Sequence, residues 1–126
     1  MAFKFSDEAR GRIAAIRGRY PDAEAAVMPA LYIGQELQGW VSPDVMDAVA
    51  EELGVPRSHV LATATFYTMF NKKPVGRFHL QVCTNVACSL RGGVQIVAAL
   101  KERLGIEAGE TSADGLFTLH EVECLA

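Results

Sequence analysis

The stretch RFHLQVCTNVACSLRGG, residues 77–93, contains the pattern that decides the fold of this chain. Its first seven residues alternate between apolar and polar side chains, which is typical of a β-strand with one covered face. Two cysteines, Cys83 and Cys88, and then a glycine pair follow the strand. The next segment, VQIVAALKERLG (residues 94–105), predicts an amphipathic helix that ends at its glycine. Its apolar face is expected to hold Val94, Val97, Leu100 and Leu104.

A second strand is predicted at LFTLHEVEC, residues 116–124, after the turn-rich stretch GETSADG. A strand, a helix and a further strand joined by a long crossover form a βαβ unit, so the two strands should be parallel with a right-handed connection. Open α/β sheets bind their ligands at the carboxyl ends of such strands. Cys83, Cys88 and Cys124 are therefore expected at one edge of the sheet. Two strands alone make a poor sheet.

The residues before about Lys73 predict helices. Ser6 is a good N-cap for the first, and the second should cover residues 23–37, with Pro29 near its start or at a kink. One side of this second helix is expected to hold Val27, Met28, Leu31, Tyr32 and Gln35. The third is the best defined, because SPDVMDAVAEELGVP combines a serine cap, a proline in the first turn and a closing glycine. Ser58 is expected to cap a fourth helix that runs into ATFYTMF, residues 64–70. The fold class is thus α+β, with a helical domain over residues 1–74 and the βαβ unit over residues 75–126.

Composition excludes several classes of function. The chain has 126 residues, half of them hydrophobic and about a fifth charged, as in average globular domains. A net charge of -3 without a basic patch gives no indication of nucleic-acid binding. No apolar stretch approaches the ~20 residues of a membrane-spanning helix, and the first ten residues lack the apolar core of an export signal. An odd number of cysteines then indicates a cytosolic location with metal or redox chemistry.

The spacing of the cysteines reduces the number of metal or redox sites that they could form. A zinc ribbon would need a second closely spaced pair, and a thioredoxin-type redox pair has only two residues between its thiols. Plant-type ferredoxins use C-x₄-C-x₂-C, but Arg91 stands where their third ligand would be. A [2Fe–2S] cluster accepts a C-x₄-C pair on one iron if a second pair comes from elsewhere. No side chains are placed as a nucleophile and its base, so no catalytic residue is predicted.

The segments ATFYTMFNKKPVGRFHLQVCTNVACSLRGG (residues 64–93) and GETSADGLFTLHEVECL (residues 109–125) resemble the thioredoxin-like [2Fe–2S] ferredoxin family. VPRSHV (residues 55–60) and the helical first half extend the resemblance over most of the chain. The family includes small ferredoxin subunits of bacterial NADH:quinone oxidoreductase, respiratory complex I. The resemblance implies an electron-transfer subunit in an NADH-oxidising module. The alternative hosts are NAD-reducing hydrogenases and NAD-dependent formate dehydrogenases.

The family pattern also implies the ligands of the cluster. It reads C-x₄-C, a long gap and C-x₃-C, so Cys83, Cys88 and Cys124 match its first three cysteines. The fourth would fall two residues beyond Ala126, together with further strands and a helix of the thioredoxin-like sheet. The resemblance therefore implies a partial ferredoxin domain, and a chain of this length alone should hold the cluster weakly. Ala62 and Thr63 depart from the family, whose members typically have Glu and Val there.

The resemblance further implies how the chain works. It would be part of an enzyme only as a subunit: an electron carrier without a substrate site, with FMN and NAD on a partner subunit and further iron–sulfur subunits in the same complex. The complex would hold it at the cytoplasmic side of the inner membrane without direct insertion.

Two rival hypotheses belong to other classes of function. One is a zinc-binding structural module, and the other is a metal-free assembly scaffold whose helices dock a partner. His59, His79 and His120 show no ligand spacing and are expected in surface or packing roles. Four residues near the end of the helical half are expected in the core or at an interface: Phe66, Tyr67, Met69 and Phe70.

Overall fold

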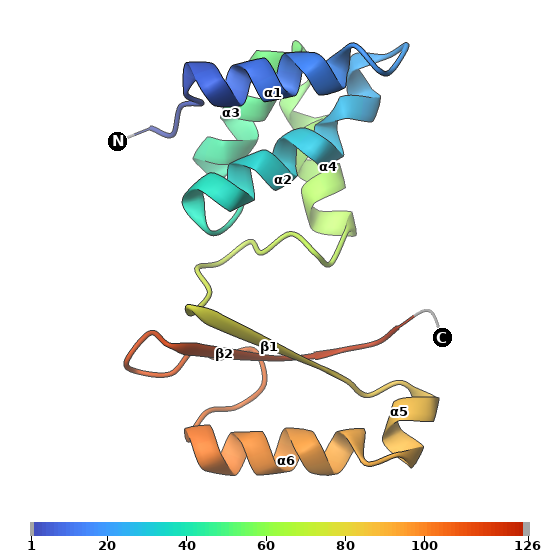
Figure 1. Ribbon diagram of the computed structural model, residues 1–126, viewed down its shortest axis with the longest axis vertical. Helices are drawn as coiled ribbons and strands as arrows, with labels where there is room; N and C mark the ends of the chain where they lie inside the picture. Colours follow the sequence, from blue (N-terminus) through green and yellow to red (C-terminus); the bar gives the residue numbers. More distant parts are fainter. Residues whose placement is uncertain (1, 125–126) are drawn as a thin grey trace. The chain divides into compact units, whose positions relative to one another are not determined.

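The computed structural model describes residues 2–124. The chain separates into two compact units, Met1–Pro74 and Val75–Ala126. The first unit is built from helices, and the second combines a two-stranded sheet with two helices (Figure 1). The predicted α+β class is confirmed. No helix within the described residues is long and apolar enough to cross a membrane.

The first and third helices of the first unit begin where their capping serines predict. The elements are α1 (Asp7–Arg17), the 3₁₀ helix η1 (Ala23–Ala26), α2 (Val27–Gln38), α3 (Pro43–Leu53) and α4 (Arg57–Phe66). The Ser6 hydroxyl accepts a hydrogen bond from the Ala9 amide at 3.2 Å, and Ser42 accepts one from the Val45 amide at 3.2 Å. The predicted second helix is divided, since its first turn is 3₁₀. Pro29 then lies in the first turn of α2, where a missing N–H costs little.

The fourth helix runs into residues 64–70 as predicted, but the residue predicted to cap it was wrong. Pro56, not Ser58, occupies the N-cap position of α4, and no side chain caps that end. Pro56 has an extended conformation, so the chain can enter the helix directly after it. The helix stops at Phe66, because Tyr67 is extended, with φ -87° and ψ 122°. Phe70 nevertheless reaches the core and is fully buried, whereas Phe66 is 77% exposed.

The face that α2 buries also differs from the predicted one. Val27 and Leu31 are buried as expected, but Tyr32, which was placed on the same face, is 46% exposed. Ile33 and Gly34 are buried instead. The physical reason is Gly34: a Cβ atom there would collide with the Val45 side chain of α3. The absence of a side chain lets α2 and α3 approach closely and turns that stripe towards the core. The buried apolar set of the unit includes Phe5, Ile13, Leu31, Val41, Val49, Val60 and Phe70.

Replacing Gly34 by alanine is therefore expected to lower the free energy of unfolding by about 1–3 kcal/mol, the usual cost of overpacking a filled core. Gly11, in the middle of α1, is the matched control, since nothing lies within 4 Å of a Cβ placed there. Gly11→Ala should instead raise stability by roughly 0.5–1 kcal/mol, because alanine is the better helix former. Urea denaturation measures both. Equal changes in the two variants would contradict the close approach of α2 and α3.

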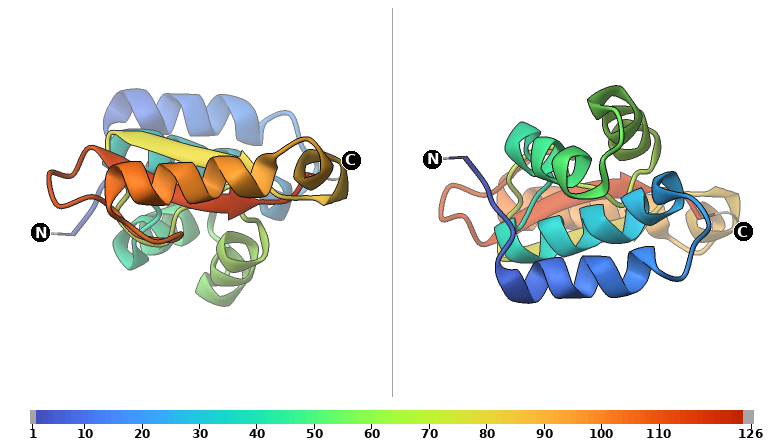
Figure 2. Two further views of the ribbon diagram at one scale, coloured as in Figure 1. Left: turned by 90° about the horizontal axis from the view of Figure 1, so that it is seen from below. Right: turned by 90° about the horizontal axis from the view of Figure 1, so that it is seen from above.

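The second unit contains a parallel pair of strands. Its elements are β1 (Phe78–Cys83), α5 (Val86–Leu90), α6 (Gly93–Leu104) and β2 (Phe117–Val122). β1 and β2 pair in parallel, from Phe78 opposite Phe117 to Cys83 opposite Val122, which confirms the predicted strand direction. The helix α6 runs along both strands (Figure 2). The short helix α5 was not predicted. The Asn85 side chain caps it by accepting from the Val86 amide at 2.8 Å.

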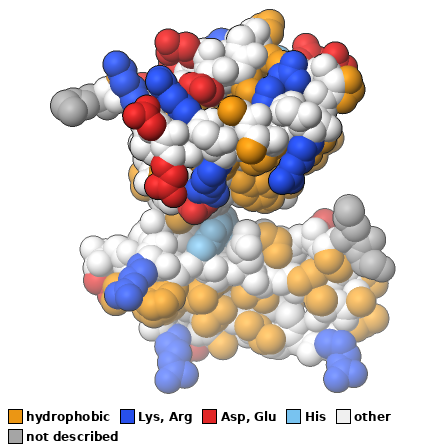
Figure 3. Space-filling model, turned by 45° about the horizontal axis from the view of Figure 1, so that its top comes forward, with side chains coloured by type: hydrophobic (Ala, Val, Ile, Leu, Met, Phe, Trp, Pro, Cys, Tyr) orange, Lys and Arg blue, Asp and Glu red, His pale blue; other side chains and the backbone are white. Residues whose placement is uncertain are grey.

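The core of the second unit is small. Its buried apolar residues are Val97, Ile106 and Leu119. The predicted apolar face of α6 is only partly correct, because Val94 is 52% exposed while Val97 is buried. Two strands offer one helix too little area to cover a wider stripe. Figure 3 accordingly shows hydrophobic side chains spread over the visible face of this unit.

Candidate functional site

The three cysteines lie where the two strands end. Cys83 is the last residue of β1, Cys88 lies within α5, and Cys124 comes two residues after β2. Because the strands are parallel, their carboxyl ends share one edge of the sheet. All three cysteines are free; Cys83 and Cys88 are half-buried, and Cys124 is exposed. The predicted gathering of the cysteines at one edge is what the structure shows.

Hydrogen bonds join the two cysteine segments. The Asn85 side-chain amide donates to the Cys124 carbonyl at 2.7 Å, and its nitrogen lies 3.6 Å from the Cys124 sulfur. The Thr84 amide donates to the Val122 carbonyl at 2.9 Å, which extends the ladder one step beyond β1. The Ser89 hydroxyl donates to the Thr84 carbonyl at 2.8 Å and closes the loop on itself. The loop that carries Cys88 is thus fastened to the strand end that carries Cys124.

The surroundings of Cys83 and Cys88 shift the pKa values of their thiols in opposite directions. The backbone amide of Asn85 lowers the pKa of Cys83 to about 7, helped by the backbone amide of Cys124 and by a hydrogen bond with the Cys88 thiol. The same interaction with Cys83 raises the pKa of Cys88, and burial raises it further. Hydrogen bonds to the charged form favour ionisation, so Cys83 becomes a thiolate at a lower pH than Cys88 does. Both other thiols act on Cys83, which places all three as neighbours.

The glycine pair after the cysteines is required by close packing. A Cβ atom on Gly93 would come within 2.5 Å of the Cys83 carbonyl oxygen and 3.0 Å of the Cys88 carbonyl oxygen. Gly92 has φ 102°, a left-handed conformation that favours glycine. The close approach is therefore between backbone groups, and the partners of Gly93 are the carbonyls of two cysteines. It fixes the start of α6 against the loop.

The chemistry of the donors fits an iron–sulfur cluster, whose iron is held by thiolates. Within residues 2–124, no three His, Cys, Asp or Glu side chains are already arranged as a metal site. The thiols are neighbours rather than converged ligands. The expected fourth position, two residues beyond Ala126, lies outside the described residues.

A pair of histidines was missed. His79 on β1 and His120 on β2 face each other through His79 Nε2 and His120 Nδ1, and their ring centroids are 4.7 Å apart. Burial lowers the pKa of His79, and the nearby His120 lowers it further. The two residues are far apart in the sequence, so spacing could not reveal them. The register of the folded strands brings them together, because it places Gln81, two residues after His79, opposite His120.

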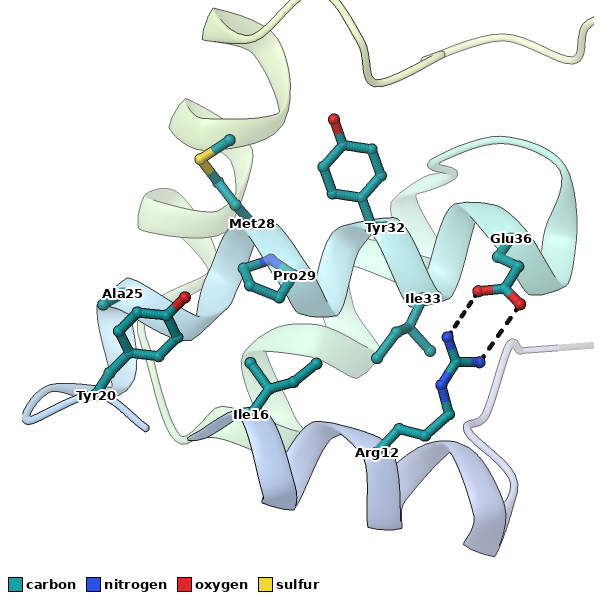
Figure 4. Close-up of a pocket in the computed structure, with 9 residues that line it drawn as sticks. All are labelled: Arg12, Ile16, Tyr20, Ala25, Met28, Pro29, Tyr32, Ile33 and Glu36. Carbon is teal, nitrogen blue, oxygen red and sulfur yellow. Dashed lines mark hydrogen bonds and ion pairs between the residues drawn. The ribbon is translucent and has the colours of Figure 1, made fainter. Parts of the chain in front are cut away.

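The helical unit contains an apolar hollow of about 500 Å³ between α1 and α2 (Figure 4). Ile16, Met28 and Tyr32 line it, and an ion pair between Arg12 and Glu36, 2.8 Å long, stands at one end. The hydrogen bond from Arg12 lowers the pKa of Glu36, which keeps this carboxylate charged. Apart from this ion pair and the phenol groups of Tyr20 and Tyr32, the lining side chains are apolar.

Comparison with known proteins identifies proteins that are similar to this chain. The family model of the thioredoxin-like [2Fe-2S] ferredoxins matches residues 13–126. A subunit of NADH-quinone oxidoreductase from Rhizobium meliloti is 50% identical over 92% of this chain and 69% of its own length. A Dictyostelium discoideum protein named NADH dehydrogenase [ubiquinone] flavoprotein 2, mitochondrial, is 40% identical over 98% of this chain and 51% of its own length. The chain thus spans between about half and two thirds of these two relatives.

A solved structure shares the fold. A chain in the crystal structure of an NAD+-reducing [NiFe]-hydrogenase in the H2-reduced state superposes with a TM-score of 0.63 over 75% of this chain and 16% of that chain. The sequences are 19% identical there, so the likeness concerns the fold alone.

Proposed function

Because the chain belongs to the thioredoxin-like [2Fe-2S] ferredoxin family, we propose that it is the electron-transfer subunit of an NADH-oxidising complex and holds one [2Fe–2S] cluster through Cys83, Cys88 and Cys124. The observation that carries this proposal is the meeting of three thiols at the carboxyl ends of two parallel strands. The names of the relatives favour NADH:quinone oxidoreductase as the host. A hydrogenase is the second candidate, supported by the shared fold.

When bound, such a cluster accepts and releases single electrons, at a potential set by its ligands, its hydrogen bonds and its exposure. Residues of this chain would supply the ligands and the hydrogen bonds that set this potential. The amides of Asn85 and Cys124 donate towards the Cys83 sulfur, which stabilises negative charge there. The Asn85 side chain fastens the two ligand segments together, and Gly93 lets α6 begin directly against them.

The test is anaerobic reconstitution of a chain that includes the position two residues beyond Ala126. We expect two irons and two acid-labile sulfides for each chain, a brown colour and an EPR signal in the reduced state. A colourless protein that retains stoichiometric zinc under the same conditions would favour the rival structural zinc module and overturn the proposal.

The proposed partner is a larger subunit that binds flavin and NAD. A [2Fe–2S] cluster carries one electron at a time, whereas NADH gives up two as hydride, so a flavin must divide the pair. Among the described residues we find no glycine-rich loop between a strand and a helix of the kind that binds dinucleotides. Such a complex, with its further iron–sulfur subunits, would hold this chain beside the membrane.

We expect the helical unit to provide much of the contact with that partner. Large apolar side chains are exposed on its surface, among them Tyr32 on α2 and Phe66 on α4, 46% and 77% exposed. Buried aromatic residues often dominate the energy of an interface. Tyr32→Glu and Phe66→Glu together should therefore weaken co-purification with the flavin-binding subunit by about tenfold or more.

Thr65→Glu is the control for the charge that Phe66→Glu brings, because it adds one negative charge at the neighbouring exposed position of α4. It should leave the affinity within about twofold, as expected for a rim position. If the double variant binds the flavin-binding subunit as tightly as the original chain, the surface of α2 and α4 is not the docking element.

A further inference from the structure

The histidine pair on the sheet is arranged as a chelating site. His79 and His120 come from neighbouring parallel strands and occupy diagonal positions, since His120 is opposite Gln81 in the register. Side chains alternate along a strand, so His79, Gln81 and His120 share the face opposite to Leu80 and Leu119. One imidazole nitrogen of each ring points at the other, with 2.5 Å between them. Two borderline-soft nitrogen ligands thus converge without help from the cysteines.

We propose that His79 and His120 form a binding site for a divalent transition-metal ion such as Zn²⁺, separate from the iron–sulfur site. Imidazole is the commonest protein ligand for such ions. Two Zn–N bonds of about 2.0–2.1 Å at a tetrahedral angle separate the nitrogens by roughly 3.3 Å. The rings need to part by less than about 1 Å to admit the ion, a movement that small side-chain rotations supply. Two waters complete a tetrahedral set, one more than in zinc sites with three protein ligands.

The two imidazole rings can give up their hydrogen bond and bind the ion without any change in their own charge. In the hydrogen bond, one of the two facing nitrogens carries the proton and the other accepts it. In the metal-bound state, both facing nitrogens present lone pairs, and each neutral ring keeps its proton on its other nitrogen. Only the tautomer of one ring changes.

Neither histidine ring of the site is fully buried. Gln81, on the same face as both histidines, is exposed, and the two rings are half-buried. An ion can therefore approach the facing nitrogens without displacing the core residue Leu119, which belongs to the other face.

Zinc titration of the cluster-loaded protein by calorimetry tests the proposal. We expect one ion for each chain, and His79→Gln and His120→Gln should each weaken zinc binding by about tenfold or more. His59→Gln is the matched control, because His59 lies on α4 in the other unit and should leave zinc binding unchanged. The visible absorption of the cluster should remain constant throughout, which shows that the ion does not bind the cysteine thiols.

A second measurement avoids dependence on the folding of the variants. In the unaltered protein, zinc should slow the modification of His79 and His120 by diethyl pyrocarbonate, read residue by residue by mass spectrometry, and should leave His59 unaffected. Zinc binding that is insensitive to both substitutions, or that occurs only as the cluster absorption is lost, would overturn the proposal. So would equal modification of His79 and His120 with and without zinc, because the pair would then be a structural hydrogen bond alone.

Discussion

Replacing Cys88 by serine is expected to abolish the visible absorption of the reconstituted protein and its reduced-state EPR signal. A thiolate binds iron of this kind and a hydroxyl binds it poorly, so the loss of one sulfur leaves an iron without a ligand. Cys88 lies within α5, beside Cys83 and close to the segment of Cys124, so no other described cysteine can take its place. Iron and labile sulfide should both fall from about two per chain towards zero, as expected for a thiolate-held cluster.

Ala87→Ser is the control for that experiment. It adds a hydroxyl to the same helix at an exposed position and leaves every thiol in place, so iron content and EPR amplitude should be unchanged. Circular dichroism of the Cys88→Ser protein should show that the helices persist. A full EPR signal from the Cys88→Ser protein would remove Cys88 from the ligand set and would require another assignment for the cluster.

The second large effect is expected from Gly93→Val. A Cβ atom at this position would meet backbone oxygens of Cys83 and Cys88, which cannot move aside as a flexible side chain could. The start of α6 must then separate from the cysteine loop. The ligands lose their relative positions, so the cluster should be lost or bound in less than about half of the chains, and stability should fall by several kcal/mol, at the upper end for overpacking.

Gly105→Ala separates this clash from ordinary backbone strain. Gly105 ends the same helix with φ 66°, but nothing lies within 4 Å of a Cβ placed there. Alanine should therefore cost only about 1 kcal/mol in the free energy of unfolding and leave the iron content intact. If Gly93→Val keeps a full complement of iron, the packing of α6 against the loop does not position the ligands.

Local signals in the sequence correctly predicted those helices and strands whose ends are set by neighbouring residues. Ser42, Pro43 and Gly54 define α3, because a cap, a first-turn proline and a left-handed glycine act within one turn of the chain. The alternation in β1 and the crossover length predicted the parallel pair. The same reasoning failed at α4, where Ser58 looked like a cap, because it could not tell which of two nearby residues turns the chain into the helix.

The sequence alone therefore determined the α+β class, the caps of α1 and α3, the parallel strands and the edge at which the cysteines gather, since each follows from local patterns and from the order of the elements along the chain. Only the tertiary structure decided the buried face of α2, the approach of Gly93 to two cysteine carbonyls and the meeting of His79 with His120. These features depend on how separate elements pack. The pairing of the two histidines depends on strand register, and a shift of one residue would have placed them on opposite faces of the sheet.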